Sequence, residues 1–178
     1  MLRLLSKILT TKKTVIPTSN LKTDIEVMEV GKKIEAKVKK IFSGSLAIRE
    51  VDAGSTNACE HELTALSNCF YDVERFGIHF VASPRHADML MVTGPVSRNM
   101  KDALVKTYEA TPDPKIVVAV GDDAIDGGIF KGSYAVLDGV DKVIPVNYYI
   151  PGDPPTPLNI LISLLEILEK IEKKTTSI

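Results

Sequence analysis

Short apolar runs alternate with helical patterns along most of the chain. Five runs are short, apolar and closed by Gly, Pro, Asp or Ser, which is typical of strands: 46–51, 78–82, 89–93, 116–120 and 143–146. Apolar residues recur at helical spacing over 60–69, 100–110 and 157–173. Strands this apolar, separated by helices, predict an α/β fold with a mainly parallel sheet and helices on both faces.

An N-terminal helical extension precedes this pattern. Residues 1–22 contain five basic groups and no acidic one. Their apolar residues recur at helical spacing at Leu2, Leu5, Ile8 and Leu9. A short basic amphipathic helix is predicted, with a frayed, solvated tail as the alternative, and a second helix is predicted over 32–42. We therefore expect an amphipathic helix and connector at 1–44 and one domain at 45–178.

Composition limits the classes of partner and compartment. With 178 residues and 44% hydrophobic content, the chain can bury one sizeable core. Its formal net charge of −1 argues against a nucleic-acid partner. The apolar stretch 158–168 is interrupted by polar residues, so no helix that crosses a membrane is expected. Arg3 and Lys7 interrupt the first apolar residues, which argues against a secretory signal and favours cytosolic exposure.

The two cysteines are not expected to form a disulfide. If 60–69 is helical, Cys59 and Cys69 lie roughly 15 Å apart at the standard helical rise. Cys69 follows Leu63 and Leu66 at helical spacing, which predicts a buried small hydrophobic residue.

Three loops contain the candidate site. They read Gly-Ser-Thr-Asn-Ala-Cys-Glu at 54–60, Gly-Asp-Asp-Ala at 121–124 and Pro-Gly-Asp-Pro-Pro at 151–155. Taken singly, the first is typical of a tight turn with a helix N-cap or of an anion site, and it lacks a nucleotide-binding phosphate loop. Asp153 alone is an ordinary turn residue. Because ligands bind beyond the carboxyl ends of strands in α/β sheets, we expect the loops to converge.

Together, these loops closely resemble the small, cluster-carrying B-type subunit shared by energy-converting membrane-bound NiFe hydrogenases and respiratory complex I. The similarity extends from about residue 46 to residue 168 and includes 71–77, 83–88 and 93–96. The resemblance implies a flavodoxin-like fold.

The same resemblance implies a 4Fe-4S site in which three ligands have changed. Family members hold the cluster with four thiolates, and those places fall here on Thr56, Cys59, Asp123 and Asp153. Soft thiolate sulfur suits iron, whereas carboxylate and hydroxyl oxygens suit harder cations. We therefore expect no conventional cofactor, with a 4Fe-4S cluster of non-cysteine ligation as the alternative.

Two other kinds of chemistry can be read from these residues. Cys59, His61, Asp123 and Asp153 include ligand types that zinc accepts, but the spacing of Cys59 and His61 is not a standard zinc signature, and hydrogen-bonded or solvated polar residues are the alternative. Glu60 resembles a family glutamate with a possible proton-path role, although a favourable interaction with the helix dipole also explains it.

The resemblance implies a small subunit of a hydrogenase-related or complex I-related oxidoreductase complex that is not catalytic alone. Its implied partners are a hydrogenase-like large subunit, a ferredoxin-like subunit and antiporter-like subunits of a membrane arm. Peripheral attachment to the cytoplasmic face of the cell membrane is expected. The interface candidates are Arg85, His86, Asp88 and Pro95.

Three functions remain open from the sequence. The degenerate site has lost electron transfer and the subunit acts as a scaffold, or an unusually ligated cluster still transfers electrons. Alternatively, the chain is a free-standing anion- or metal-binding α/β protein.

Overall fold

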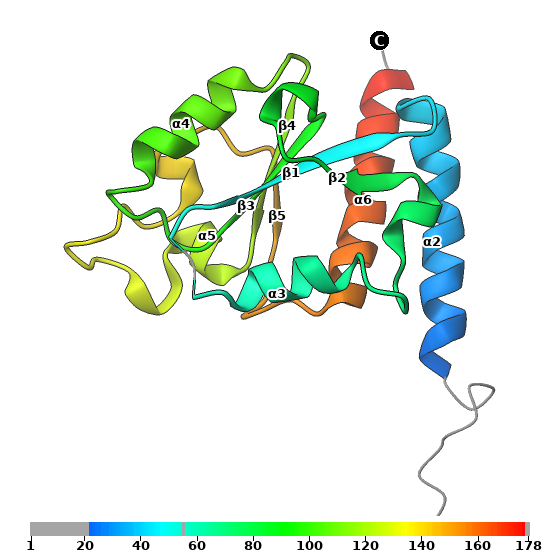
Figure 1. The fold of residues 1–178 in the computed structure, drawn as a ribbon, viewed down its shortest axis with the longest axis horizontal. Coiled ribbons are helices and arrows are strands. Elements are labelled where there is room, and N and C mark those ends of the chain that lie inside the picture. The colour runs from blue at the N-terminus through cyan, green and yellow to red at the C-terminus, as the bar shows by residue number, and fades with distance from the viewer. Residues whose placement is uncertain (1–21, 55, 177–178) are drawn as a thin grey trace, which may run out of the picture.

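A parallel sheet of five strands forms the centre of the described residues, 22–54 and 56–176, in this computed structural model (Figure 1). The strands are β1 (Leu46–Asp52), β2 (Ile78–Phe80), β3 (Met89–Thr93), β4 (Ile116–Val120) and β5 (Tyr148–Ile150). They lie in the order β2-β1-β3-β4-β5, and every neighbouring pair is parallel. The prediction of an α/β fold with a parallel sheet is confirmed.

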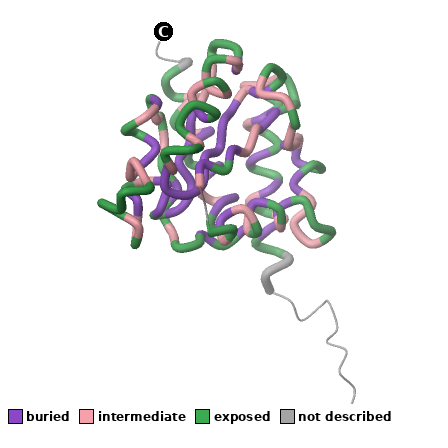
Figure 2. Tube along the Cα trace, turned by 60° about the vertical axis from the view of Figure 1, so that its left-hand side comes forward, coloured by how far each residue is buried: buried purple, intermediate pink, exposed green. Residues whose placement is uncertain are grey.

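Helices cover both faces of the sheet because the strands β3 and β4 are apolar on both sides. On β3, Met89 and Met91 pack in one apolar cluster and Leu90 and Val92 in another, as the two-residue repeat of a strand requires. The first cluster includes residues of α2 (Lys22–Ile41), α3 (Ala58–Ala65) and α6 (Pro157–Thr176). The second includes residues of α4 (Lys101–Ala110) and α5 (Asp122–Asp126). Figure 2 shows the buried trace running through the sheet between these layers.

The second predicted helix is longer than the pattern indicated. It begins at Lys22, and its Val27, Ile34 and Val38 are buried in the same core as the strands. The helix runs beside α6 (Figure 1), where Lys37 and Lys40 both pair with Glu172. The amphipathic helix predicted near the start of the chain falls outside the described residues.

The strand predicted at 143–146 is wrong, because the last strand is β5. Val140–Lys142 forms a 3-10 turn, and the N–H of Ile144 donates to the carbonyl of Val140, so Val140 and Ile144 enter the core from a loop. Pairing with β4 starts at Asn147. Its N–H donates to the Val117 carbonyl at 2.9 Å, and its side-chain oxygen accepts from the Val117 N–H at 2.7 Å.

The expected burial of Cys69 is also wrong, since this residue is exposed. Helix α3 ends at Ala65, and a tight turn follows in which the N–H of Ser67 donates to the Thr64 carbonyl. The side chain of Asn68 then accepts hydrogen bonds from the next loop residues and turns the chain away from the helix axis. Cys59 and Cys69 are both free thiols.

In the part of the chain that the structure describes, no helix combines the length and apolar character that crossing a membrane requires.

Candidate functional site

The loops after β4 and β5 are joined at the carboxyl edge of the sheet. The N–H of Gly121 donates to the Ile150 carbonyl at 2.8 Å, just beyond the paired ends of the two strands. The N–H of Asp122 donates to the Gly152 carbonyl at 2.9 Å, and the N–H of Gly152 donates to the Asp122 carboxylate at 2.9 Å. This reciprocal pair fixes Asp123 and Asp153, the next residue in each loop, relative to one another.

The loop after β1 meets this pair through a close contact between Cys59 and Gly121. A Cβ atom at Gly121 would lie 2.5 Å from the Cys59 sulfur, and Gly121 has a φ of +90°. Both observations require glycine at this position, because a side chain would collide with the thiol and the backbone is left-handed. The predicted convergence of the three loops is therefore visible in the backbone itself.

The four predicted cluster positions differ in their exposure. Cys59 is buried in the first turn of α3, and Asp123 is buried in the first turn of α5. Thr56 and Asp153 are exposed in their loops. The structure brings Cys59, Asp123 and Asp153 within electrostatic range of one another.

Carboxylates raise the pKa of both buried groups in this site. Burial raises the pKa of the Cys59 thiol to about 12, with further increases from Glu60, Asp123, Asp153 and Asp122. The free thiol is therefore protonated at neutral pH and is a poor nucleophile. Burial also raises the pKa of Asp123, and after burial the carboxylate of Asp153 raises it most.

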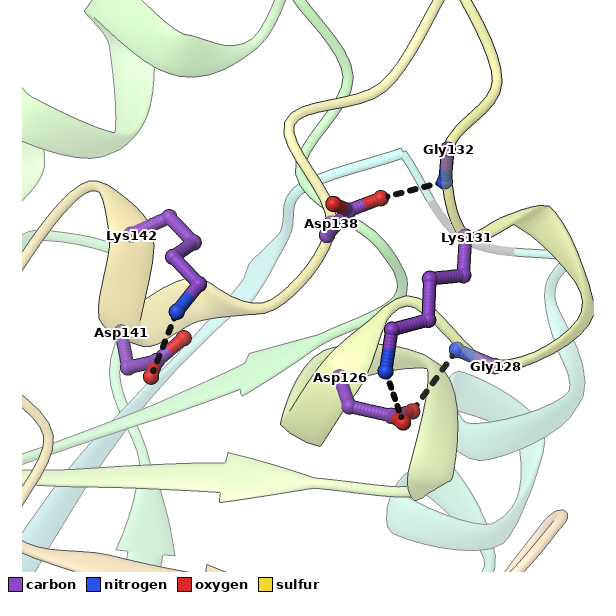
Figure 3. A network of polar contacts seen from close by, with 7 residues as sticks. All are labelled: Asp126, Gly128, Lys131, Gly132, Asp138, Asp141 and Lys142. Atoms are coloured by element: carbon purple, nitrogen blue, oxygen red, sulfur yellow. Dashed lines mark hydrogen bonds and ion pairs between the residues drawn. The ribbon is translucent and has the colours of Figure 1, made fainter.

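The Asp123 carboxylate has no compensating partner among the described residues. The residue is 8% exposed, and its side chain neither accepts a hydrogen bond nor forms an ion pair there. It lies against Gly128, where an added Cβ would be 1.9 Å from Oδ1. Nearby, Lys131 pairs instead with Asp126, whose carboxylate also accepts from the Gly128 N–H (Figure 3).

These residues do not fit a conventional 4Fe-4S cluster. They offer one cysteine, two carboxylates and a neutral hydroxyl where the cluster requires four soft thiolates. The proposed zinc set is not assembled either, because within the described ranges no three His, Cys, Asp or Glu side chains come together as metal ligands. His61 is exposed whereas Cys59 is buried, so the two side chains face different surroundings.

A pocket of about 350 Å³ adjoins the site on its Glu60 side, and the sequence did not reveal it. Residues from β1, α3 and the end of β2 line it, including Arg49, Glu50, Glu60, Leu63 and Phe80. Burial raises the pKa of Glu50, with Glu60 and Asp52 acting in the same direction. Two charged residues, Arg49 and Glu50, inside an otherwise apolar strand were the available sequence signal.

The four interface candidates do not form one surface. Arg85 and His86 are exposed in a 3-10 turn before the amino end of β3. Asp88 is half-buried, and its carboxylate accepts from the Ala47 N–H at 2.9 Å, which ties it to β1. Pro95 is buried beyond the opposite, carboxyl end of β3.

Comparison with known proteins supports the resemblance. The family model for the 20 Kd subunit of NADH ubiquinone oxidoreductase matches residues 57–167. Formate hydrogenlyase subunit 7 of Escherichia coli K12 is 42% identical over 141 residues, 79% of this chain and 55% of that protein. The probable membrane-bound hydrogenase subunit mbhJ of Pyrococcus furiosus is 42% identical over 138 residues, 78% of this chain and 83% of that protein. The chain thus spans about half of the first relative and most of the second.

Solved structures agree in fold. A chain of the archaeal membrane-bound sulfane sulfur reductase superposes with a TM-score of 0.66 at 37% identity, covering 78% of this chain and 75% of that chain. A chain of an NAD⁺-reducing [NiFe]-hydrogenase gives a TM-score of 0.55 at 19% identity, covering 71% and 92%, which shows likeness of fold alone. With the family model matching more than half of its length, the chain belongs to the family of the 20 kDa subunit of NADH ubiquinone oxidoreductase.

Proposed function

We propose that this chain is the small subunit of a membrane-bound oxidoreductase complex related to hydrogenases and complex I, and that its degenerate cluster site does not transfer electrons. It packs against a hydrogenase-like large subunit and has a scaffolding role at that interface. The named relatives are subunits of formate hydrogenlyase and of a membrane-bound hydrogenase, which supports this assignment.

The observation that carries the proposal is the replacement of thiolates by carboxylates on an intact backbone arrangement. Gly121, Gly152 and the hydrogen bonds between their loops hold the site together. Within it, Asp123 and Asp153 provide hard oxygen donors and Cys59 provides a protonated thiol. Donors of this kind favour water, a basic side chain or a hard cation over iron and sulfide.

The remaining partners follow from the same assignment. A ferredoxin-like subunit and antiporter-like membrane subunits complete the complex, and this chain lies peripherally on the cytoplasmic face of the cell membrane. Residues 1–13 supply a modest anchor, because their basic groups suit an anionic surface and their apolar residues suit its boundary.

Electron transfer through an unusually ligated cluster is the second candidate. It is favoured by Cys59, which keeps its thiol at a family ligand position and lies within electrostatic range of Asp123 and Asp153. An iron and sulfide assay separates the two functions.

The test is to purify the complex anaerobically through a tag on this chain and to measure iron, labile sulfide and the visible spectrum. Metal in the other subunits is subtracted by comparing the wild type with the triple variant T56C/D123C/D153C. We expect about four additional irons and four sulfides only in the triple variant. A matched control, T107C/D113C/D141C, adds three cysteines away from the site, the first of them on α4. Equal iron in the wild type and the triple variant, together with loss of about four irons in C59A, would establish the second candidate instead.

A further inference from the structure

The site that the family uses for a cluster contains, in this chain, the buried carboxylate of Asp123 with the exposed carboxylates of Asp122 and Asp153 beside it. Asp123 and Asp153 follow directly after Asp122 and Gly152, whose reciprocal hydrogen bonds hold the two loops together. Like charges held together at low solvent exposure are unfavourable unless a cation balances them. The isolated subunit therefore carries negative charge at this edge of the sheet that no positive group among the described residues is seen to balance.

The Asp123 carboxylate is the group in this site that most needs a positively charged partner. It is more than nine-tenths buried and has no hydrogen-bond or ion-pair partner in the described ranges. Lys131, a nearby basic residue, already pairs with another carboxylate, because its Nζ lies 2.9 Å from that of Asp126 (Figure 3). Asp153, the strongest charge acting on Asp123, is exposed and so leaves the site accessible from outside.

We infer that a lysine or arginine side chain of the large subunit inserts between Asp123 and Asp153 and occupies the place of the lost cluster. This inference rests on the proposed function. A basic side chain supplies the charge and the donors that the two carboxylates lack, and a charge-assisted hydrogen bond at a buried site is strong. A bare metal ion fits less well, because no group of three suitable ligands is assembled within the described residues.

The test uses the complex purified through a tag on the full chain, with the large subunit identified by mass spectrometry. D123N/D153N keeps the shape of both residues and removes both charges. Its control, D113N/D141N, removes two exposed carboxylates that pair with Lys115 and Lys142, so the change in net charge is the same. We expect the double asparagine variant to retain the large subunit at least about tenfold less than the wild type, and the control to retain it normally.

A fold defect is separated by thermal unfolding of each full chain. Because D123N/D153N removes like-charge repulsion, it should melt at or above the temperature of the wild type. If it melts lower, D153N alone, at an exposed loop position, replaces it in the retention assay. A loss of retention with an unchanged melting temperature supports the inference.

Two results would overturn the inference. One is a variant that retains the large subunit as well as the wild type does. The other is about one divalent cation per wild-type chain that disappears in D123N/D153N, with retention abolished by a chelator, because a hard cation would then hold the site. If the wild type itself copurifies with no hydrogenase-like large subunit, the proposed function fails first, and that result is distinct from both.

Discussion

Gly121 follows β4 and Cys59 lies in the first turn of α3, yet the sulfur of Cys59 occupies the space that a side chain at Gly121 would require. We predict that Gly121→Ala destabilises the fold through two effects. The left-handed backbone costs roughly 1–3 kcal/mol for a residue with a Cβ, and the collision with the sulfur adds to this.

Gly44→Ala is the matched control, because its φ of +99° is similar and nothing lies within 4 Å of an added Cβ. Urea unfolding should show a larger loss for Gly121→Ala, and Cys59→Ala should restore part of the difference in the double variant. Equal losses at the two glycines would disprove the contact.

The stability of the fold should respond to pH through Asp123. Its pKa is raised in the folded state, so the folded protein binds a proton more tightly than the unfolded chain. The resulting stabilisation is present at low pH and is lost as pH rises above the ordinary aspartate value of about 4. Asp123→Asn should therefore gain stability relative to the wild type as pH increases from about 4 to about 7. Chemical denaturation across this range, with Asp141→Asn as the control, measures the difference, and a flat difference contradicts the prediction.

Glu172 should have the opposite pH dependence. Hydrogen bonding to Lys37, and then to Lys40, lowers the pKa of this carboxyl to about 2. Its contribution is present above the ordinary glutamate value and is lost as pH falls toward about 2. Glu172→Gln should destabilise the α2–α6 contact at neutral pH by a small amount, because the pair is near the surface, and salt should reduce the effect. Glu166→Gln, at an exposed position of the same helix, should not reproduce it.

The two thiols should differ in reactivity. Cys59 is buried and its pKa is raised to about 12, whereas Cys69 is exposed. Alkylation at pH 8 followed by peptide mass spectrometry should modify Cys69 at least about a hundredfold faster. Unfolding in urea should make the two rates similar, and rapid modification of Cys59 in the folded chain would exclude the buried thiol described above.

The N-terminal segment should attach the complex to membranes without contributing to the core. Deleting residues 1–13 should lower the fraction of protein that sediments with membranes while leaving the unfolding transition unchanged. L5D/I8D, which places charge among the apolar positions, should act like the deletion, and S6D/T10D should act less. Sedimentation unaffected by the deletion would show that attachment depends on other subunits.

The fold was predictable where local pattern and burial agreed. The strands at 89–93 and 116–120 match their predicted bounds, because central strands are apolar on both faces and end sharply at turn residues. The last strand was missed because Val140 and Ile144 are buried from a loop, while exposed Asn147 starts the real pairing. Periodicity reports burial, and it does not distinguish a buried strand from a buried loop.

The convergence of the three loops could be predicted from the sequence, whereas the interface residues and the pocket beside the site could not. The carboxyl-end rule predicted that the three loops converge, and the contact of Cys59 with Gly121 and the hydrogen bonds between Asp122 and Gly152 agree with it. Arg85 and Pro95 were grouped because both fall within motifs similar to the family, but opposite ends of β3 separate them. The pocket beside Glu60 arises from the packing of α3 over β1 and β2, which no single segment encodes.

The reciprocal hydrogen bonds between Asp122 and Gly152 use neither of the side chains that would carry a ligand. The hydrogen bonds that hold the two loops together therefore do not depend on which residues occupy positions 123 and 153. A lineage could exchange those two residues one at a time without first losing the fold. Such exchanges alter the stability that the Asp123 carboxyl contributes, but the hydrogen bonds that join the two loops remain, so the chemistry of this site can change while its backbone is kept.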